Sequence, residues 1–251
     1  MNDLLVYEIN TFFDYWKKRQ EFINNLDLHK NRHEAYVLLL SHLDGLSNIW
    51  VEKIGKDKCR DFSRRKGLIF DAFLSDYGGN FFQLVSLPHV WNRVQNNNQN
   101  NDLNKILPEE VREFLKNFRR QPVSGLSSKD KAVRRNIYED LCLEDIGNTI
   151  LKKYPHVDKE KLWYWMRYSR YGKILYNQLR CMFIHQGRPG KNTHDFSFSA
   201  YEHEPTYGGH IYQVPNPIGF SAEFLKTILE RCIDKYQEES LILRVDPLPD
   251  T

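Results

Sequence analysis

The first third of the chain alternates apolar and polar residues with the period of an amphipathic helix. Apolar side chains recur at mostly three- and four-residue spacing over Leu4 to Asn25, His33 to Ile54 and Lys58 to Tyr77. Because residues three and four apart share one face of a helix, each stretch predicts a helix with one buried side. We expect Gly55 to end the second helix in a left-handed conformation, which glycine tolerates. Three helices in succession favour a bundle.

The middle of the chain continues the helical pattern around a polar tract. Pro108, followed by two glutamates, is typical of a helix start, because its missing N–H is not needed there and acids favour the helix dipole. Further helices are predicted over Arg134 to Tyr154 and over Lys159 to Gln186. The tract within residues 94–104 is rich in asparagine and has little to bury, so we expect a loop.

The pattern changes character after Gly187. The segment DFSFSAY alternates aromatic and small residues, and GGHIYQVP follows a Gly-Gly turn signal, which predicts a short β-hairpin. Ser221 is a good N-cap for a last helix over Ala222 to Tyr236. The hairpin and this helix occupy residues 192–240. The expected fold is therefore mainly α, a single helical-bundle domain over residues 1–251 with a small late β-hairpin.

Composition excludes several classes of protein. The 251 residues are 41% hydrophobic and 27% charged, which gives enough apolar surface for a sizeable core. The longest apolar run is Ala35 to Leu40, far short of the roughly 20 residues that a membrane-spanning helix needs. The sequence after Met1 lacks a basic–apolar secretory pattern, and the four cysteines are widely separated. We expect a cytoplasmic protein with free thiols and no membrane partner.

The net charge of +3, from 36 basic and 33 acidic residues, hides a strongly basic stretch. Residues 162–191 contain six Lys or Arg and no Asp or Glu, together with seven aromatic residues. Cations interleaved with aromatic rings are what single-stranded nucleic acid needs, because phosphates require neutralisation and bases stack. For any single aromatic residue, burial in the core is the more common explanation. The absence of acids favours a single-stranded nucleic acid as partner.

Within that stretch, Arg180 is followed by four residues and then by His185, in YGKILYNQLRCMFIHQGRPG. An R-x4-H pair near a helix end, before a glycine-containing turn and inside a helical bundle, resembles the signature of the HEPN superfamily (higher eukaryotes and prokaryotes nucleotide-binding). The helix AYVLLLSHLDGLSNIW is similar to the one that lies beside the motif helix in such proteins. The likeness extends over residues 33 to 190 in organisation, but only the motif is specific.

The resemblance implies a HEPN-like fold and metal-independent RNA cleavage at a site shared by two protomers. His185 would then be the acid/base, and Arg180 would stabilise the charge of the transition state. Residues five apart on a helix point about 140° away from each other, so one helix cannot easily bring both onto one phosphate. We therefore expect a homodimer. The resemblance further implies a toxin or effector of a prokaryotic defence or toxin–antitoxin system, with a cognate partner.

Other polar residues are candidates around the motif. Asp44 and Asn48 lie one turn apart on the earlier helix and are expected to face it or to be solvated. Cys181 stands where many active members carry a polar residue. Lys173, Asn177, Arg188 and Lys191 are the remaining candidates for RNA binding or for positioning the motif.

Two alternatives remain open. The same fold could be an inactive RNA-binding or protein-interaction module, in which Arg180 forms an ordinary salt bridge and His185 satisfies a helix-end carbonyl. The second alternative is an antitoxin-like binding partner.

His29 and His33 lie four apart but lack a third ligand, and no Walker or GxSxG motif occurs. We expect no metal and no cofactor.

Overall fold

The structure is a computed structural model, and it describes residues 2–95, 106–120, 136–195, 203–208 and 215–248. The α-helices are α1 (Asn2–Asn24), α2 (Arg32–Glu52), α3 (Lys66–Tyr77), α4 (Leu87–Gln95), α5 (Glu109–Asn117), α6 (Leu143–Lys153), α7 (Lys159–Arg167), α8 (Tyr171–Ile174), α9 (Cys181–Gln186) and α10 (Ala222–Leu243). A π-helical turn, η5 (Leu175–Arg180), joins α8 to α9, and η1 (Arg60–Phe62), η2 (Asn80–Gln83) and η4 (Ile137–Glu139) are 3-10 turns. The short strands are β1 (Leu84–Val85), β2 (Leu141–Cys142), β3 (Thr193–His194), β4 (Thr206–Tyr207) and β5 (Ile218–Gly219).

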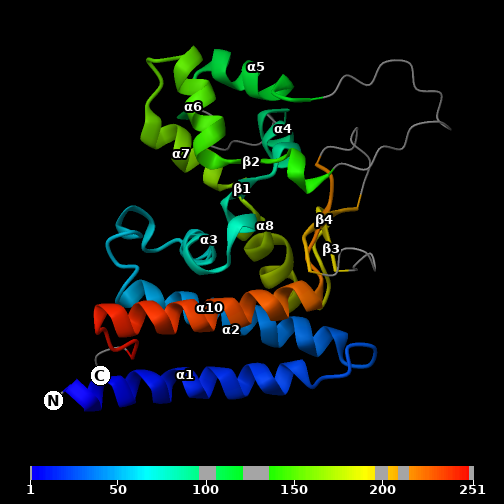
Figure 1. The fold of residues 1–251 in the computed structure, drawn as a ribbon. Helices are drawn as coiled ribbons and strands as arrows, with labels where there is room; N and C mark the ends of the chain where they lie inside the picture. Colours follow the sequence, from blue (N-terminus) through cyan, green and yellow to red (C-terminus); the bar gives the residue numbers. More distant parts are fainter. Residues whose placement is uncertain (1, 96–105, 121–135, 196–202, 209–214, 249–251) are drawn as a thin grey trace.

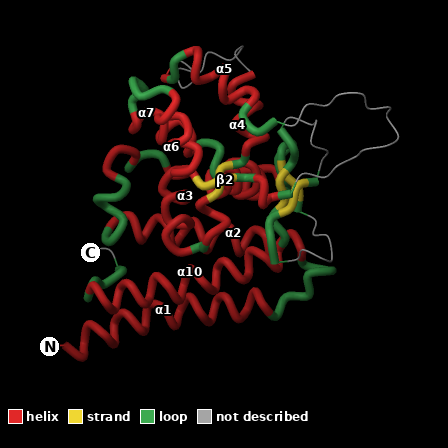
Figure 2. The backbone as a smooth tube through the Cα atoms, turned by 45° about the horizontal axis from the view of Figure 1, so that its top comes forward, coloured by secondary structure: helices red, strands yellow, loops and turns green. Residues whose placement is uncertain are grey.

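The fold is mainly α with a small late β element, as the sequence predicts. Helices α1, α2 and α10 lie side by side, α3 covers the α2–α10 layer, and α8 packs against α3 (Figures 1 and 2). Helices α4 to α7 form a separate group at the other end of the molecule (Figure 1). No helix in the described part of the chain is long and apolar enough to cross a membrane.

The core consists of two hydrophobic clusters. The larger one fills the space between α1, α2, α3, α8, α9 and α10, and includes Phe13, Trp50 and Phe73, all fully buried. The smaller one lies among α4 to α7 around Trp91 and Trp165. Large aromatic side chains bury much apolar area and contribute strongly to the larger cluster, whereas the smaller one consists mainly of aliphatic side chains around its two tryptophans.

A buried polar network joins the two groups of helices. The Asp140 carboxylate accepts hydrogen bonds from the Tyr171 hydroxyl at 2.8 Å and the Tyr207 hydroxyl at 2.5 Å. Ser86 Oγ lies 2.7 Å from the Tyr207 hydroxyl and 2.8 Å from His89 Nδ1. Burial lowers the pKa of His89 to about 3, with Arg93 adding to the effect, so its ring is neutral at pH 7. The hydrogen-bonded side chains are all buried, and we interpret the network as structural; they are Ser86, His89, Asp140, Tyr171 and Tyr207.

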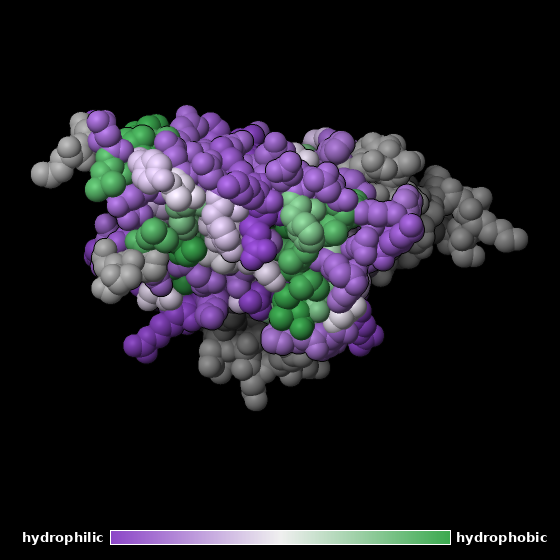
Figure 3. Space-filling model, turned by 90° about the horizontal axis from the view of Figure 1, so that it is seen from below, coloured by the Kyte–Doolittle hydropathy of each residue, from purple (hydrophilic) through white to green (hydrophobic). Residues whose placement is uncertain are grey.

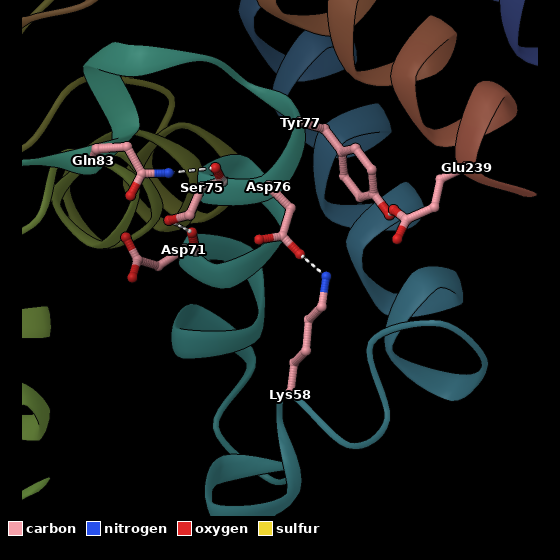
Figure 4. A network of polar contacts seen from close by, with 7 residues as sticks. All are labelled: Lys58, Asp71, Ser75, Asp76, Tyr77, Gln83 and Glu239. Atoms are coloured by element: carbon pink, nitrogen blue, oxygen red, sulfur yellow. Dashed lines mark hydrogen bonds and ion pairs between the residues drawn. The ribbon is translucent and has the colours of Figure 1, made fainter. Parts of the chain in front are cut away.

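Helix α3 is held at its C-terminal half by polar contacts (Figure 4). Lys58 Nζ donates to Asp76 at 2.5 Å, and the Tyr77 hydroxyl donates to Glu239 of α10. Gln83 Nε2 donates to the Ser75 carbonyl at 2.6 Å. These contacts fix α3 between α10 and the turn after α2, and so determine where its N-terminus lies.

The structure differs from the prediction in the segment between the second and third helices. Helix α2 ends at Glu52, and Gly55 is not left-handed; instead its Cα lies so close to Trp50 that a Cβ would come within 2.6 Å of the ring. Helix α3 begins at Lys66, not at Lys58, because residues 56–65 are mostly charged and form turns around the buried Phe62.

The next predicted helix also starts late. Helix α6 begins at Leu143, because Asn136 and Glu139 form a capping box that closes η4 and β2 then pairs with β1. Pro108, by contrast, precedes α5 as predicted, with Glu109 and Glu110 in the first turn.

The long helix predicted over residues 159–186 is interrupted. It breaks at 168–170, where Ser86 N–H donates to the Ser169 carbonyl at 2.8 Å and Arg170 forms a bridge to Val85. A crossing chain therefore takes the backbone groups that a continuous helix would use. The helix resumes as α8, η5 and α9.

The late β element is a three-stranded sheet in the order β3-β5-β4. Strand β5 pairs with β3 in parallel and with β4 antiparallel. The two expected hairpin strands lie mostly outside the described residues.

Ser221 caps α10 as predicted, since its Oγ accepts the Phe224 N–H at 3.0 Å. The predicted loop at 94–104 starts two residues late, because Val94 is buried in α4; residues 96–104 lie outside the described part.

The face lined by α1 carries separate apolar patches in a mainly hydrophilic surface (Figure 3). Leu4, Tyr7, Tyr15 and Phe22 of α1 are more than half exposed. Phe22 therefore does not belong to the buried side of the first helix, where Ile23 takes its place.

Candidate functional site

Arg180 lies at the end of η5 and faces α2. Its Nη2 donates to Asp44 Oδ2 at 2.7 Å, and the side chain is 21% exposed. Burial lowers the pKa of the guanidinium, but the Asp44 carboxylate opposes this and the net shift is upward, so Arg180 keeps its charge. The Tyr176 ring lies 5.4 Å from the guanidinium carbon. Arg180 Nε has no hydrogen-bond partner among the residues that the structure describes.

The backbone before Arg180 forms a π-helical turn, which is rare and is frequently found at functional sites. The turn is widened where Gly190 comes close, since the Gly190 N–H donates to the Gln178 carbonyl at 2.7 Å. A Cβ on Gly190 would lie 2.3 Å from the Gln178 side-chain oxygen, so a larger residue there would require that side chain to move. The segment after the motif therefore folds back on η5 and fixes it.

His185 lies in the last turn of α9 and is exposed. Gly187 ends this helix in the left-handed conformation, with φ at 67°. Phe183, on the side that faces α2, stacks on Tyr36 at 4.8 Å between ring centroids. Arg180 lies on the same side as Phe183, whereas helical spacing places His185 about 140° away from Arg180. One copy of the chain thus directs Arg180 inward and His185 to solvent.

Asp44 is hydrogen-bonded to Arg180 of the motif, whereas Asn48 is linked to Arg180 only through Asp44. Asn48 Nδ2 donates to the Asp44 carbonyl of its own helix at 2.7 Å and does not contact Arg180. Asp44 is buried, and within the described part of the chain its second carboxylate oxygen, Oδ1, has no hydrogen-bond partner. Asp44 is therefore the residue that orients Arg180.

The other candidates lie around the motif in different environments. Lys173 Nζ donates to the exposed Asn177 at 3.1 Å, and burial lowers the pKa of the Lys173 ammonium. Cys181 is half-buried at the edge of the core. Arg188 and Lys191 are exposed in the turn after α9.

The acid-free stretch obtains its acids from other helices. Arg170 is buried and lies 3.5 Å from Asp71 of α3, just as Arg180 pairs with Asp44 of α2. Arg167 is half-buried with its guanidinium 4.9 Å from the Phe62 ring. The free positive charge of the stretch is therefore smaller than its sequence suggests.

Most aromatic side chains of the same stretch are unavailable for base stacking. Trp165, Tyr171, Tyr176 and Phe183 are buried in the core, whereas the other three are half-buried; these are Trp163, Tyr164 and Tyr168. The common expectation for aromatic residues, burial, describes this segment better than an open stacking surface.

A pocket of about 470 Å³ lies between the end of α2, the following turn and the start of α3. It is lined by Asn48, Val51, Glu52, Lys56, Ser63, Arg64, Lys66 and Ile69. Apart from Asn48, sequence reasoning missed these residues, although the run Arg64-Arg65-Lys66 was a signal of concentrated charge. We call it the α3 pocket.

The described residues contain no group of three His, Cys, Asp or Glu side chains that could hold a metal ion. Comparisons with protein-family models, with curated proteins and with solved structures found no match.

Proposed function

We propose that this chain is a metal-independent endoribonuclease of the HEPN type. The observation that carries the proposal is the R-x4-H pair itself: Arg180 is anchored and charged beside Asp44, and His185 is exposed five residues later, around a π-helical turn. The role of toxin or effector in a prokaryotic defence or toxin–antitoxin system, with a cognate partner, follows from the resemblance alone.

The residue types suit cleavage of RNA by its own 2′-hydroxyl. A base removes the 2′-proton, the oxygen attacks phosphorus, and the bond to the 5′-oxygen breaks as that oxygen gains a proton. The products are a 2′,3′-cyclic phosphate and a 5′-hydroxyl. His185 is suited to move these protons near neutral pH, and the permanent charge of Arg180 is suited to stabilise the phosphorane.

A site that uses both residues takes them from two copies of the chain. Arg180 and His185 leave their helix in directions about 140° apart, so a two-fold pairing of motif helices is needed to bring one of each together. The proposed enzyme is accordingly a homodimer with RNA as its substrate.

The first test incubates the protein with single-stranded RNA in EDTA. Because His185 is exposed and makes no described hydrogen bond, we expect His185→Ala to lower cleavage by about 10²- to 10⁴-fold without changing the melting temperature. His29→Ala is the matched control, an exposed histidine outside the motif. Equal cleavage by all three proteins, or none by the wild type, would refute the proposal.

A second test mixes two inactive variants, Arg180→Lys and His185→Ala. If each site takes its arginine from one copy and its histidine from the other, the mixed dimer regains one complete site. Random exchange should then restore about a quarter of wild-type activity. No recovery after confirmed exchange would exclude a shared site.

The non-catalytic alternative, an RNA-binding or protein-interaction module, is favoured by one observation. The Arg180–Asp44 contact is also what a structural ion pair requires, and Arg170 shows the same pairing with Asp71. Under this alternative, the wild type binds RNA without cleaving it, and His185→Ala binds equally well.

A further inference from the structure

The α3 pocket is strongly basic for its size. Lys56, Arg64 and Lys66 line it against a single acid, Glu52. All three cations are exposed, and none has an ion-pair partner among the described residues. Its volume of about 470 Å³ lies within the range of roughly 300–1,000 Å³ that is typical of small-ligand sites. Three cations without an ion-pair partner among the described residues therefore line a concave surface.

The neighbouring cations of the turn differ in this respect. Lys58 is paired with Asp76, and Arg60 with Asp57. Arg65 Nη1 donates to the Tyr168 hydroxyl at 3.0 Å, and its guanidinium lies 5.1 Å from the Tyr164 ring. The cations that line the pocket are thus the ones left for an external anion.

The start of α3 runs against the usual preferences of a helix N-terminus. Its N-cap is Arg65, whose side chain makes no capping hydrogen bond, and its first turn contains no acid. The N-terminal end of a helix dipole is positive, so the adjacent Arg64, Arg65 and Lys66 repel it. A segment that violates several local rules together is expected at a functional site. A bound anion would satisfy both the helix end and the unpaired cations.

The pocket is linked to the candidate active site through short contacts. Asn48 lines the pocket and donates to the Asp44 carbonyl, and Asp44 in turn holds Arg180. On the other side, a Cβ on Gly67, the second residue of α3, would lie 2.2 Å from Lys173 Nζ and 2.7 Å from the Tyr176 ring. The pocket and Arg180 thus both lie against α2, and the start of α3 beside the pocket comes close to Lys173 and Tyr176.

We infer that the α3 pocket binds a phosphate-bearing unit of single-stranded RNA through Lys56, Arg64 and Lys66. Phosphate is the ligand that best fits three cations beside a helix N-terminus. The choice of RNA as the source of the phosphate rests on the proposed ribonuclease function. The half-buried rings of Tyr164 and Tyr168 contact Arg65, which stands between the pocket residues Arg64 and Lys66 in the chain.

The test measures binding of a short, fluorescently labelled 2′-O-methyl RNA, which cannot be cleaved by its own 2′-hydroxyl. The triple variant Lys56→Gln, Arg64→Gln, Lys66→Gln should lower the slope of log affinity against log salt by about 2, since each single-strand phosphate contact contributes about 0.7. Lys18→Gln, Lys152→Gln, Arg231→Gln is the matched control; it removes three exposed cations on α1, α6 and α10. We expect little change of slope in the control.

Several outcomes would overturn the inference. Equal slopes in the triple variant and the wild type, or an equal decrease in the control, would show that the pocket makes no specific phosphate contact. Displacement of the RNA by poly-glutamate as well as by unlabelled RNA would assign the pocket to acidic peptides. If the triple variant does not fold by circular dichroism, Arg64→Gln and Lys66→Gln decide singly, each with a decrease of about 0.7.

The binding assay separates this inference from the proposed function. A slope that falls only in the pocket variant, with no cleavage by the wild type, would support the pocket and refute the ribonuclease. Cleavage that depends on His185, with an unchanged slope in the pocket variant, would do the reverse.

Discussion

Two arginines ten residues apart, Arg170 and Arg180, are built into the molecule in parallel ways and differ in what surrounds them. Each belongs to the acid-free stretch, and each pairs with an aspartate from another helix, Asp71 or Asp44. The Arg170 and Asp71 side chains are 9% and 1% exposed, against 21% and 10% for Arg180 and Asp44. The first pair is sealed in the interior, and the second lies at the edge of the surface.

The surroundings explain the difference. Arg170 Nη2 also donates to the Phe82 carbonyl at 2.8 Å, and the buried Ser86–His89 contact lies close by, because Ser86 pairs with Ser169. This interior junction connects the two groups of helices. Arg180, by contrast, is followed by the exposed His185 in the next element of the chain. The same arginine–aspartate pairing thus supports a structural role for Arg170 and is compatible with a chemical role for Arg180.

The largest expected effect is loss of the interior pair. Asp71→Ala leaves the buried Arg170 charge without its carboxylate, and we expect a loss of about 3–5 kcal/mol in the free energy of unfolding. Urea denaturation followed by circular dichroism measures it. Asp14→Ala, at an exposed position of α1, should stay within about 0.5 kcal/mol of the wild type. Similar midpoints for both variants would mean that the interior pair is not structural.

Acid should weaken the interior junction through His89. The folded-state pKa is about 3, against 6.5 for an ordinary histidine, so the unfolded state binds the extra proton between these values. Stability contributed by the neutral ring is complete above about pH 6.5 and decreases as the pH falls towards 3, by up to ~1.4 kcal/mol per pH unit.

The variant His89→Asn removes that titration while keeping a polar group near Ser86. Between pH 4.5 and 6.5 we expect the free energy of unfolding to vary less steeply with pH in the variant, by the equivalent of about one proton. Chemical denaturation over this pH series measures it. A variant with the same steepness as the wild type would assign the acid sensitivity to other groups.

The smallest expected effect on stability is at the surface pair. Asp44→Ala should cost about 1–3 kcal/mol, since Arg180 loses its partner but keeps some access to water. If Arg180 acts on RNA, cleavage should fall further than the loss of folded protein accounts for, because the guanidinium is no longer oriented. Stability and cleavage measured on one preparation test this. Wild-type cleavage per folded molecule would show that Asp44 has no positioning role.

The sequence predicted part of the candidate site. Asp44 was one of two candidates expected either to face the motif or to be solvated, and in the structure its carboxylate accepts a hydrogen bond from Arg180. The α3 pocket was not predicted, because its residues come from α2, a turn and α3, and nothing in their spacing shows that they adjoin. The free positive charge of residues 162–191 was overestimated from the sequence, because the aspartates that pair with Arg170 and Arg180 are distant in sequence.

Part of the fold was likewise predicted from the sequence. The starts of α1 and α10 follow the sequence closely, since a periodic apolar face and the Ser221 cap act locally, whereas α10 continues to Leu243, beyond the predicted end at Tyr236. The break near Ser169 did not show in the sequence, because it depends on a hydrogen bond to Ser86 across 83 positions of the chain (169 minus 86).

The sequence by itself determined the mainly helical class, the starts of several helices and the five-residue spacing of Arg180 and His185. These depend on periodicity, capping and residue type, which act over a few residues. Tertiary structure decided which arginines are neutralised, which aromatic rings are buried and where free positive charge remains. Ion pairing and desolvation depend on distance in space, and only the folded chain brings Asp71 to Arg170, Asp44 to Arg180 and Lys56 beside Arg64.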